Sequence, residues 1–376
     1  MSVRYHEVAP SNDNAAGFVE FNTIDFELLA EGRKMLKNTI TVCADIVVNS
    51  SGSTPMDANK RIYIDNKIGF HSVFSSWSCE AKGSMLENIQ DYPRYVSMVS
   101  SATMDKNDVF SVKNQAEGRQ VVQAAGSIVI QAVACKNTTA TNAIQTEPAN
   151  FSILPSICFN NVVGDDYSFN KNGSIRISCN LARNIACLYG PASTSAQKPN
   201  YTLSNVRVKF NSIPDDGKQG AIMMNSVVGI KSVINSQQAN ISSRVPAAAV
   251  SGVVISFVKQ AHENEYEKNS YALEKFNNID EVQYLFSDST NNYITYVIDD
   301  RGDMIAKGLN ALSDSGHSNV DASKLAANQG FMIGLGFEDM LDLRNQKFTV
   351  QLKTSDALIG ANPKTAFLYF LNLLTL

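Results

Sequence analysis

Apolar residues in this chain fall mainly in short runs, separated by segments rich in glycine, asparagine, proline and serine. The region 59–104 shows the pattern most clearly. Apolar and polar residues alternate at Ile62 and Ile64, and apolar residues continue to Trp77, which we expect in the core. This pattern predicts a strand, a tight turn in which Gly83 takes a positive φ, a second strand and a short helix.

The predicted helix begins near Asp91, whose side chain can cap its N-terminus. Pro93 is tolerated in the first turn, where its missing N–H would be unpaired in any case. Four apolar residues recur at helical spacing and form one face; they are Tyr92, Tyr95, Val96 and Val99.

The region 279–314 repeats this order. Alternating residues predict a strand over 282–286, the pair Asn291-Asn292 predicts a turn, and 293–298 predicts a second strand. Asp300 or Asp303 can cap a following helix, whose apolar face is Ile305, Leu309 and Leu312. Aligning the turns gives an offset of 292 − 83 = 209 residues. The residue identities hardly match, so the comparison depends only on the order of the predicted elements. That order favours a duplicated unit over two independent hairpins.

Other short apolar runs predict further strands. We expect them at 39–48, 120–134, 151–159, 174–188 and 201–210, and then at 223–234, 250–258, 331–337, 347–353 and 365–374. The segment 18–38 is predicted as a strand packed under the first domain. Helical periodicity is otherwise scarce and no β-α-β rhythm occurs, which excludes a Rossmann-like or parallel-barrel enzyme. The pattern therefore predicts an all-β protein.

The length of 376 residues favours two domains of ordinary size. The strongest turn signal is Ile213-Pro214-Asp215-Asp216-Gly217, and we place the boundary there. The predicted parts are a flexible N-terminal arm at 1–17, a first domain at 18–214 and a second at 215–376.

The composition and charge of the chain limit the kinds of molecule that it is expected to bind. Charged residues make up 18% and the formal net charge is −4, so a general polyanion-binding role is disfavoured. The N-terminus lacks the apolar segment of a signal peptide, and no apolar run approaches the ~20 residues of a transmembrane helix. We expect a protein that is not secreted by a signal peptide.

The six cysteines include no C-x-x-C pair; they are Cys43, Cys79, Cys135, Cys158, Cys179 and Cys187. Buried reduced thiols are favoured over a zinc or redox site. The histidines are scattered at His6, His71, His262 and His317. His262-Glu263 begins like a zinc-protease motif, but Tyr266 occupies the second ligand position.

The remaining motifs are better explained by structure than by chemistry. Gly334-Leu335-Gly336 indicates close backbone packing. The doublets Asp165-Asp166, Asp215-Asp216 and Asp299-Asp300 can bind a cation, although solvated turns are favoured. Arg301-Gly302-Asp303 is interpreted as a turn and helix cap. We therefore expect no catalytic, cofactor-binding or metal-binding residues, and no enzyme.

Several runs resemble the double jelly-roll major capsid proteins of double-stranded DNA viruses, of the virophage and polinton-like type. They are KIGFHSVF at 67–74, MLENI at 85–89 leading into YPRY at 92–95, YTLSNV at 201–206, NSY at 269–271 and FNNI at 276–279. The resemblance implies two tandem eight-stranded antiparallel jelly-roll sandwiches, each with a short inserted helix.

The resemblance further implies a major capsid protein. Three chains would form a pseudo-hexameric capsomer in an icosahedral shell around a double-stranded DNA genome, in contact with neighbouring capsomers, penton and minor capsid proteins. It implies a location in the virion, assembly inside the host cell and no sequence-specific contact with nucleic acid; an internal membrane is neither implied nor excluded. The alternatives are a minor or vertex (penton-type) capsid protein and a β-sandwich adhesion or carbohydrate-binding protein.

Overall fold

The computed structural model divides into two compact units. The first takes its described residues from 1–96, 105–222 and 262–271, and the second from 97–104, 223–261 and 272–376. The predicted domain limits stay a prediction. The structure describes residues 2–50, 62–65, 67–103, 116–119, 121–124, 127–130, 135–136, 149–190, 198–276, 278–287, 293–317, 332–344 and 346–376.

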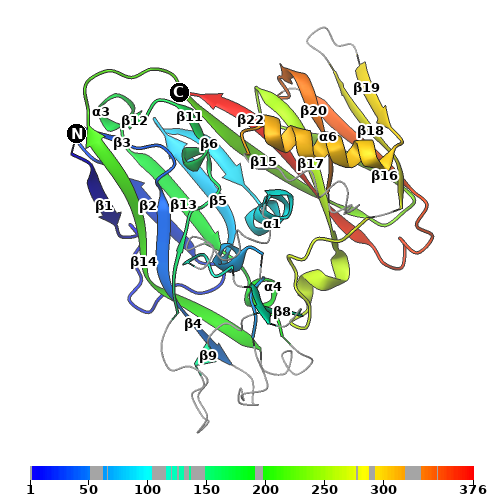
Figure 1. Ribbon diagram of the computed structural model, residues 1–376, viewed down its shortest axis with the longest axis horizontal. Helices are drawn as coiled ribbons and strands as arrows, with labels where there is room; N and C mark the ends of the chain where they lie inside the picture. The colour runs from blue at the N-terminus through cyan, green and yellow to red at the C-terminus, as the bar shows by residue number, and fades with distance from the viewer. Residues whose placement is uncertain are drawn as a thin grey trace. The chain divides into compact units, whose positions relative to one another are not determined.

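Two antiparallel layers build the first unit. One layer contains four strands in the spatial order β1 (Arg4–Val8), β14 (Pro199–Pro214), β4 (Thr41–Ser50) and β10 (Ala149–Ile153). The other has the order β2 (Thr23–Leu28), β13 (Ile175–Leu181), β5 (Phe74–Ala81) and β6 (Ser84–Ile89). Figure 1 shows the long strand β14 beside β1. Burial alternates along β13, as expected for a strand with one face in a core.

Shorter elements complete the first unit. The additional strands are β3 (Arg33–Met35), β7 (Val121–Ala124), β8 (Ser127–Ile130), β9 (Cys135–Lys136), β11 (Val162–Gly164) and β12 (Tyr167–Ser168). The helices are η1 (Gly69–Val73), α1 (Tyr92–Thr103), η3 (Cys158–Asn160), α3 (Phe169–Asn172) and α4 (Asn184–Cys187). Residues 92–96 of α1 belong to this unit.

The described residues of the second unit form eight strands in two layers. One layer has the order β15 (Ile222–Ile234), β22 (Lys364–Thr375), β17 (Val250–Lys259) and β20 (Met332–Leu341). The other has the order β16 (Gln238–Arg244), β21 (Lys347–Thr354), β18 (Ile279–Ser287) and β19 (Tyr293–Ile298). Helix α6 (Arg301–Asp314) lies across β17 and β20 (Figure 1), and the short helix η4 (Gln260–Asn264) follows β17.

The core of the second unit lies between its layers. Alternate residues of β21 are buried, and Phe348 packs edge-on against Phe370 at 5.1 Å between ring centroids. This arrangement follows from the period of two along each strand.

The two units share one topology. The elements correspond one to one in chain order and in layer position. The series in the first unit is β1, β2, β4, β5, β6, α1, β10, β13 and β14, and the series in the second is β15, β16, β17, β18, β19, α6, β20, β21 and β22. Each unit is thus an eight-stranded antiparallel jelly roll with a helix inserted after its fifth strand. The predicted fold class is confirmed.

The predicted hairpin–helix repeat is confirmed as an order of elements. The second strands are offset by 293 − 84 = 209 residues and the helices by 301 − 92 = 209. In the first hairpin, Lys82 and Gly83 both have positive φ, at 54° and 72°, as a two-residue hairpin turn requires. The predicted turn at Asn291-Asn292 lies outside the described residues.

The prediction of a flexible arm at 1–17 is wrong for Arg4–Val8, which form β1 against β14. The His6 ring stacks on Phe210 at 4.7 Å, and its Nε2 lies 2.7 Å from the Ser212 hydroxyl. A polar strand at a sheet edge carries little hydrophobic signal in its sequence.

Two local predictions also need correction, and one strand was not predicted. The strand expected before Phe74 is instead the 3₁₀ helix η1 over Gly69–Val73. The strand predicted at 174–188 ends at Leu181, and α4 follows because the Asn184 N–H donates to Glu20 Oε2 at 2.8 Å. Strand β16 was not predicted, because Ile241 is its only fully buried residue.

Candidate functional site

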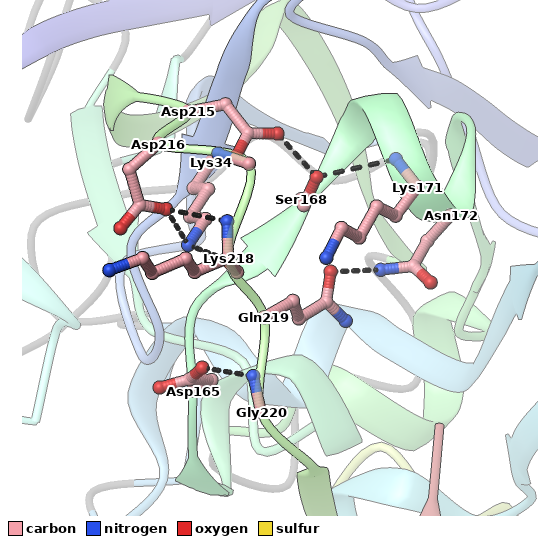
Figure 2. Close-up of polar contacts among 11 residues, drawn as sticks. Lys34, Asp165, Ser168, Lys171, Asn172, Asp215, Asp216, Lys218, Gln219 and Gly220 are labelled. Atoms are coloured by element: carbon pink, nitrogen blue, oxygen red, sulfur yellow. Dashed lines mark hydrogen bonds and ion pairs between the residues drawn. The ribbon is translucent and has the colours of Figure 1, made fainter.

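The first polar cluster holds the segment that follows β14 against the first unit (Figure 2). Lys34 of β3 is buried, and its Nζ lies 2.5 Å from Asp216 Oδ1 and also donates to the Lys218 carbonyl. Asp215 accepts a hydrogen bond from the Ser168 hydroxyl at 2.5 Å. The segment after β14 is therefore held to the first unit at three nearby residues, Asp215, Asp216 and Lys218.

Two more contacts extend this cluster. Asn172 Nδ2 donates to Gln219 Oε1 at 3.0 Å, and the Gly220 N–H donates to the Asp165 carboxylate. Figure 2 shows that these side chains face the segment 215–220 from β3, α3 and the turn before β12. The cluster is a local fastening built of side-chain oxygens, one ammonium group and backbone N–H donors.

Electrostatics explain why the carboxylates stay ionised there. The Ser168 hydroxyl lowers the pKa of Asp215, and the Lys34 ammonium lowers the pKa of Asp216. The hydrogen bond that Lys34 donates to Asp216 raises the pKa of Lys34 in turn. Opposite charges at this distance favour both charged forms.

The structure brings two of the three predicted acidic doublets to this cluster. Asp165 and Asp215 contact it directly, and Asp166 accepts a hydrogen bond from the Lys37 N–H at 2.9 Å. The carboxylates face N–H, O–H and ammonium donors, which supports structured turns as their role. The third doublet serves α6, because Asp300 Oδ1 accepts from the Asp303 N–H at 2.8 Å.

A second cluster is buried around His71 of η1. Its Nδ1 lies 2.7 Å from the Tyr92 hydroxyl, and its Nε2 lies 3.5 Å from Glu117 Oε2. Arg119 Nε lies 2.8 Å from the same Glu117 oxygen, and the Ser156 N–H donates to the Tyr92 hydroxyl at 3.0 Å. Burial raises the pKa of Tyr92, so the hydroxyl stays neutral. The network joins η1, α1 and the segment 116–119.

The same network explains why the run KIGFHSVF at 67–74 contains a glycine. Gly69 has a φ of 53°, and a Cβ at that position would lie 2.1 Å from the Glu117 carbonyl oxygen. The Phe70 N–H donates to the same oxygen at 2.8 Å. Glycine is needed because the backbone of 117–119 packs directly against this turn.

A third cluster brings Cys79, Glu87 and Cys158 together. All three are buried, and one ligand atom from each lies within 4.8 Å of the other two. Cys79 and Glu87 are cross-strand partners in β5 and β6, and the Cys158 N–H donates to Glu87 Oε2 at 2.6 Å. Burial raises the pKa of Cys158; the hydrogen bond from Cys158 lowers the pKa of Cys79, but burial leaves it above its ordinary value.

The other candidate residues stay dispersed. The four histidines lie in β1, η1, η4 and the turn after α6. Glu263, next to His262, lies 3.8 Å from the Arg94 guanidinium within the first unit. Burial lowers the pKa of His6, and it lowers the pKa of His317 to about 4.

Two motif interpretations are confirmed. Arg301, Gly302 and Asp303 form the first turn of α6, with Asp300 as the cap. Gly334 lies where β20 meets α6, and a Cβ there would lie 2.6 Å from the Val253 carbonyl oxygen and 2.9 Å from Gly308 Cα. The G-x-G run is thus a packing motif.

The Cys79–Glu87–Cys158 cluster was missed by the sequence analysis. A regular hairpin about the turn at Lys82-Gly83 would pair Cys79 with Leu86, but a bulge shifts its partner to Glu87. Cys158 enters from a segment 71 residues further along the chain. The only available sequence signal was the presence of two thiols in apolar runs.

Among the described residues, the structure contains no helix long and apolar enough to span a membrane.

No family model matches the sequence, and no curated protein matches it. Solved structures do match its fold. The Faustovirus major capsid protein has a TM-score of 0.60 at 10% identity, covering 100% of this chain and 90% of that chain. The protein VP54 of PBCV-1, fitted into a reconstruction of the virophage Sputnik, has a TM-score of 0.59 at 9% identity, with coverage of 100% and 95%.

A chain of the Sputnik virophage structure has a TM-score of 0.58 at 9% identity, covering 100% of this chain and 85% of that chain. These neighbours are double jelly-roll capsid proteins. The likeness extends over the whole of this chain, which has the double jelly-roll fold.

Proposed function

We propose that this protein is the major capsid protein of a double-stranded DNA virus. The observation that carries the proposal is the pairing of two complete jelly rolls in one chain, matched along its full length by capsid proteins of three viruses. A chain with two like-built rolls is suited to contacts with copies of itself, because each roll offers similar surfaces to a neighbour.

The proposed assembly is a homotrimer. Three chains with two rolls each supply six sandwiches, and this number gives a pseudo-hexameric capsomer that can tile an icosahedral shell. Many weak contacts between capsomers add up over the shell. The partners are neighbouring capsomers, penton proteins and minor capsid proteins, and the location is the virion after assembly inside the host cell.

The proposed role requires neither catalysis nor a cofactor. The polar clusters around Lys34 and His71 make internal contacts that hold segments of the first unit together. The formal net charge of −4 supports a shell that does not bind the genome through a basic surface. The buried position of Trp77, 1% exposed, argues against its use as a sugar-binding aromatic platform.

Size-exclusion chromatography with light scattering tests the proposed oligomer. A trimer of 41.0 kDa chains has a mass of 3 × 41.0 = 123 kDa. We expect this mass over a dilution series of the purified full-length chain. A mass of 41.0 kDa at every concentration would contradict the proposal, and a fivefold assembly would support the vertex-protein alternative instead.

A further inference from the structure

The buried trio in the first unit has the composition of a metal site. Cys79 and Glu87 face each other across the β5–β6 pair, directly beside the bulge in that pair. Cys158 opens η3 and brings its sulfur to the same point from a distant segment. Bulges redirect side chains and recur beside functional sites.

We propose that Cys79, Glu87 and Cys158 bind one thiophilic divalent cation, such as Zn²⁺. Two sulfurs and one carboxylate oxygen from three separate elements converge within 4.8 Å. In a tetrahedral zinc site with Zn–S bonds of ~2.3 Å, ligand sulfurs lie roughly 3.8 Å apart. The three ligand atoms are therefore close to the required separation before any metal enters.

Ligand chemistry selects this class of cation. Thiolates favour Zn²⁺ and related soft ions over Mg²⁺ and Ca²⁺, which take oxygen ligands. The Cys158 N–H also donates to Glu87 Oε2 at 2.6 Å, which fixes the carboxylate orientation. Hydrogen bonds of this kind orient the ligands of known metal sites. Three protein ligands leave the fourth position of the ion to water or another small ligand.

Burial adds a physical reason for the site. Glu87 is 3% exposed, and both sulfurs are fully buried. A carboxylate in such a place is costly unless positive charge or hydrogen bonds compensate it. A divalent cation between the three groups would add positive charge to the hydrogen bond that Glu87 already accepts from the Cys158 N–H. It would also tie the β5–β6 hairpin to η3, and this interior role is independent of the capsid assembly.

Cobalt titration of the purified, reduced full-length protein tests the site directly. We expect about one Co²⁺ per chain, with a near-ultraviolet thiolate-to-cobalt charge-transfer band that Zn²⁺ then removes. Cys79→Ser and Cys158→Ser should abolish the band, and Glu87→Gln should weaken Co²⁺ affinity at least about tenfold. Cys179→Ser is the matched control, because Cys179 is equally buried on the adjacent strand β13 but lies outside the trio.

Three results would overturn the proposal. The first is the absence of a thiolate–cobalt band in the wild-type chain at saturating Co²⁺. This measurement does not depend on the folding of any variant. The second is a band that survives in both folded cysteine variants. The third is a Cys79–Cys158 disulfide, found by peptide mass mapping of protein isolated without reductant, that persists in place of bound metal.

Discussion

Helices α1 and α6 occupy the same place in the two jelly rolls, yet different chemistry holds them. In the second unit, α6 is capped by Asp300 and packs by close backbone contact, with Gly308 against Gly334 of β20. In the first unit, α1 follows Asp91, whose φ is 52°, and buried polar contacts hold its start. The Tyr92 hydroxyl lies 2.7 Å from His71 Nδ1, and Arg94 Nη1 donates to the Ser270 carbonyl at 2.6 Å.

Topology therefore constrains the positions of the elements more strongly than it constrains their contacts. A helix after the fifth strand is common to both units, whereas one is anchored by hydroxyl, imidazole and guanidinium groups and the other by glycine.

Removing Trp77 should damage the first unit most. Its indole ring packs against Phe74 at 5.0 Å and edge-on against Tyr92 at 5.9 Å between centroids, at the start of α1. Trp77→Ala should lower the free energy of unfolding by about 3–5 kcal/mol, measured by urea denaturation. Trp77→Phe should cost less because it keeps an aromatic ring. Equal unfolding midpoints for wild type and Trp77→Ala would show that the residue is not part of the core.

Adding a methyl group at Gly334 should separate α6 from β20. The new Cβ would lie 2.9 Å from Gly308 Cα of α6 and 2.6 Å from the Val253 carbonyl oxygen of β17, so the backbone must shift. Gly334→Ala should cost about 1–3 kcal/mol by thermal or urea unfolding. Gly360→Ala is the control, since its nearest contact would be an ordinary 3.6 Å, and it should stay within about 0.5 kcal/mol. A stability loss at Gly360 as large as that at Gly334 would refute the packing argument.

Loss of the α6 cap should have a moderate effect. Asp300→Ala removes the acceptor of the Asp303 N–H and should cost about 1 kcal/mol in urea unfolding. Asp299→Ala removes the neighbouring exposed carboxylate and should change stability by less than about 0.5 kcal/mol. Equal effects of the two changes would mean that the net charge at this terminus, and not the cap, stabilises α6. The cap predicted at Asp91 for α1 stays a prediction.

Acidification should weaken the second unit through His317. Burial lowers the pKa of His317 to about 4 from 6.5, so the folded state resists protonation. Between these pH values the unfolded chain binds a proton that the folded chain does not, and stability falls as pH decreases through that window. The effect on stability should be the smallest, because the His317 side chain is partly exposed and solvent screening reduces the stability change that follows from its lowered pKa. Urea midpoints at several pH values should show a shallower decline for His317→Gln; an identical decline would contradict this assignment.

The sequence predicted the parts of the fold that local patterns determine. Alternation over 282–286 indicated strand β18, the short apolar run at 347–353 indicated β21, and the turn at Gly83 indicated the first hairpin. Strand β16 escaped because its residues are mostly polar and its partner β21 fixes it from 107 positions away, as in the Ser242–Thr349 hydroxyl contact. The helix α4 escaped because a distant carboxylate, Glu20, accepts from its first N–H.

The candidate site was less predictable because its contacts also join residues that are far apart in the sequence. The Lys34 cluster joins residues from three separated segments, and the acidic doublets appeared as separate turns in the sequence. The Cys79–Glu87 pairing depends on a bulge that shifts the hairpin register by one residue. A one-residue shift changes which side chains meet across a strand pair, and local composition does not encode it.

Electron microscopy of the purified full-length protein tests whether the chain forms a trimeric capsid subunit. We expect class averages with threefold symmetry and six lobes, one for each jelly roll of three chains. Particles with a single pair of lobes, or with fivefold symmetry, would contradict the proposal that two like-built rolls make this chain a trimeric capsid subunit.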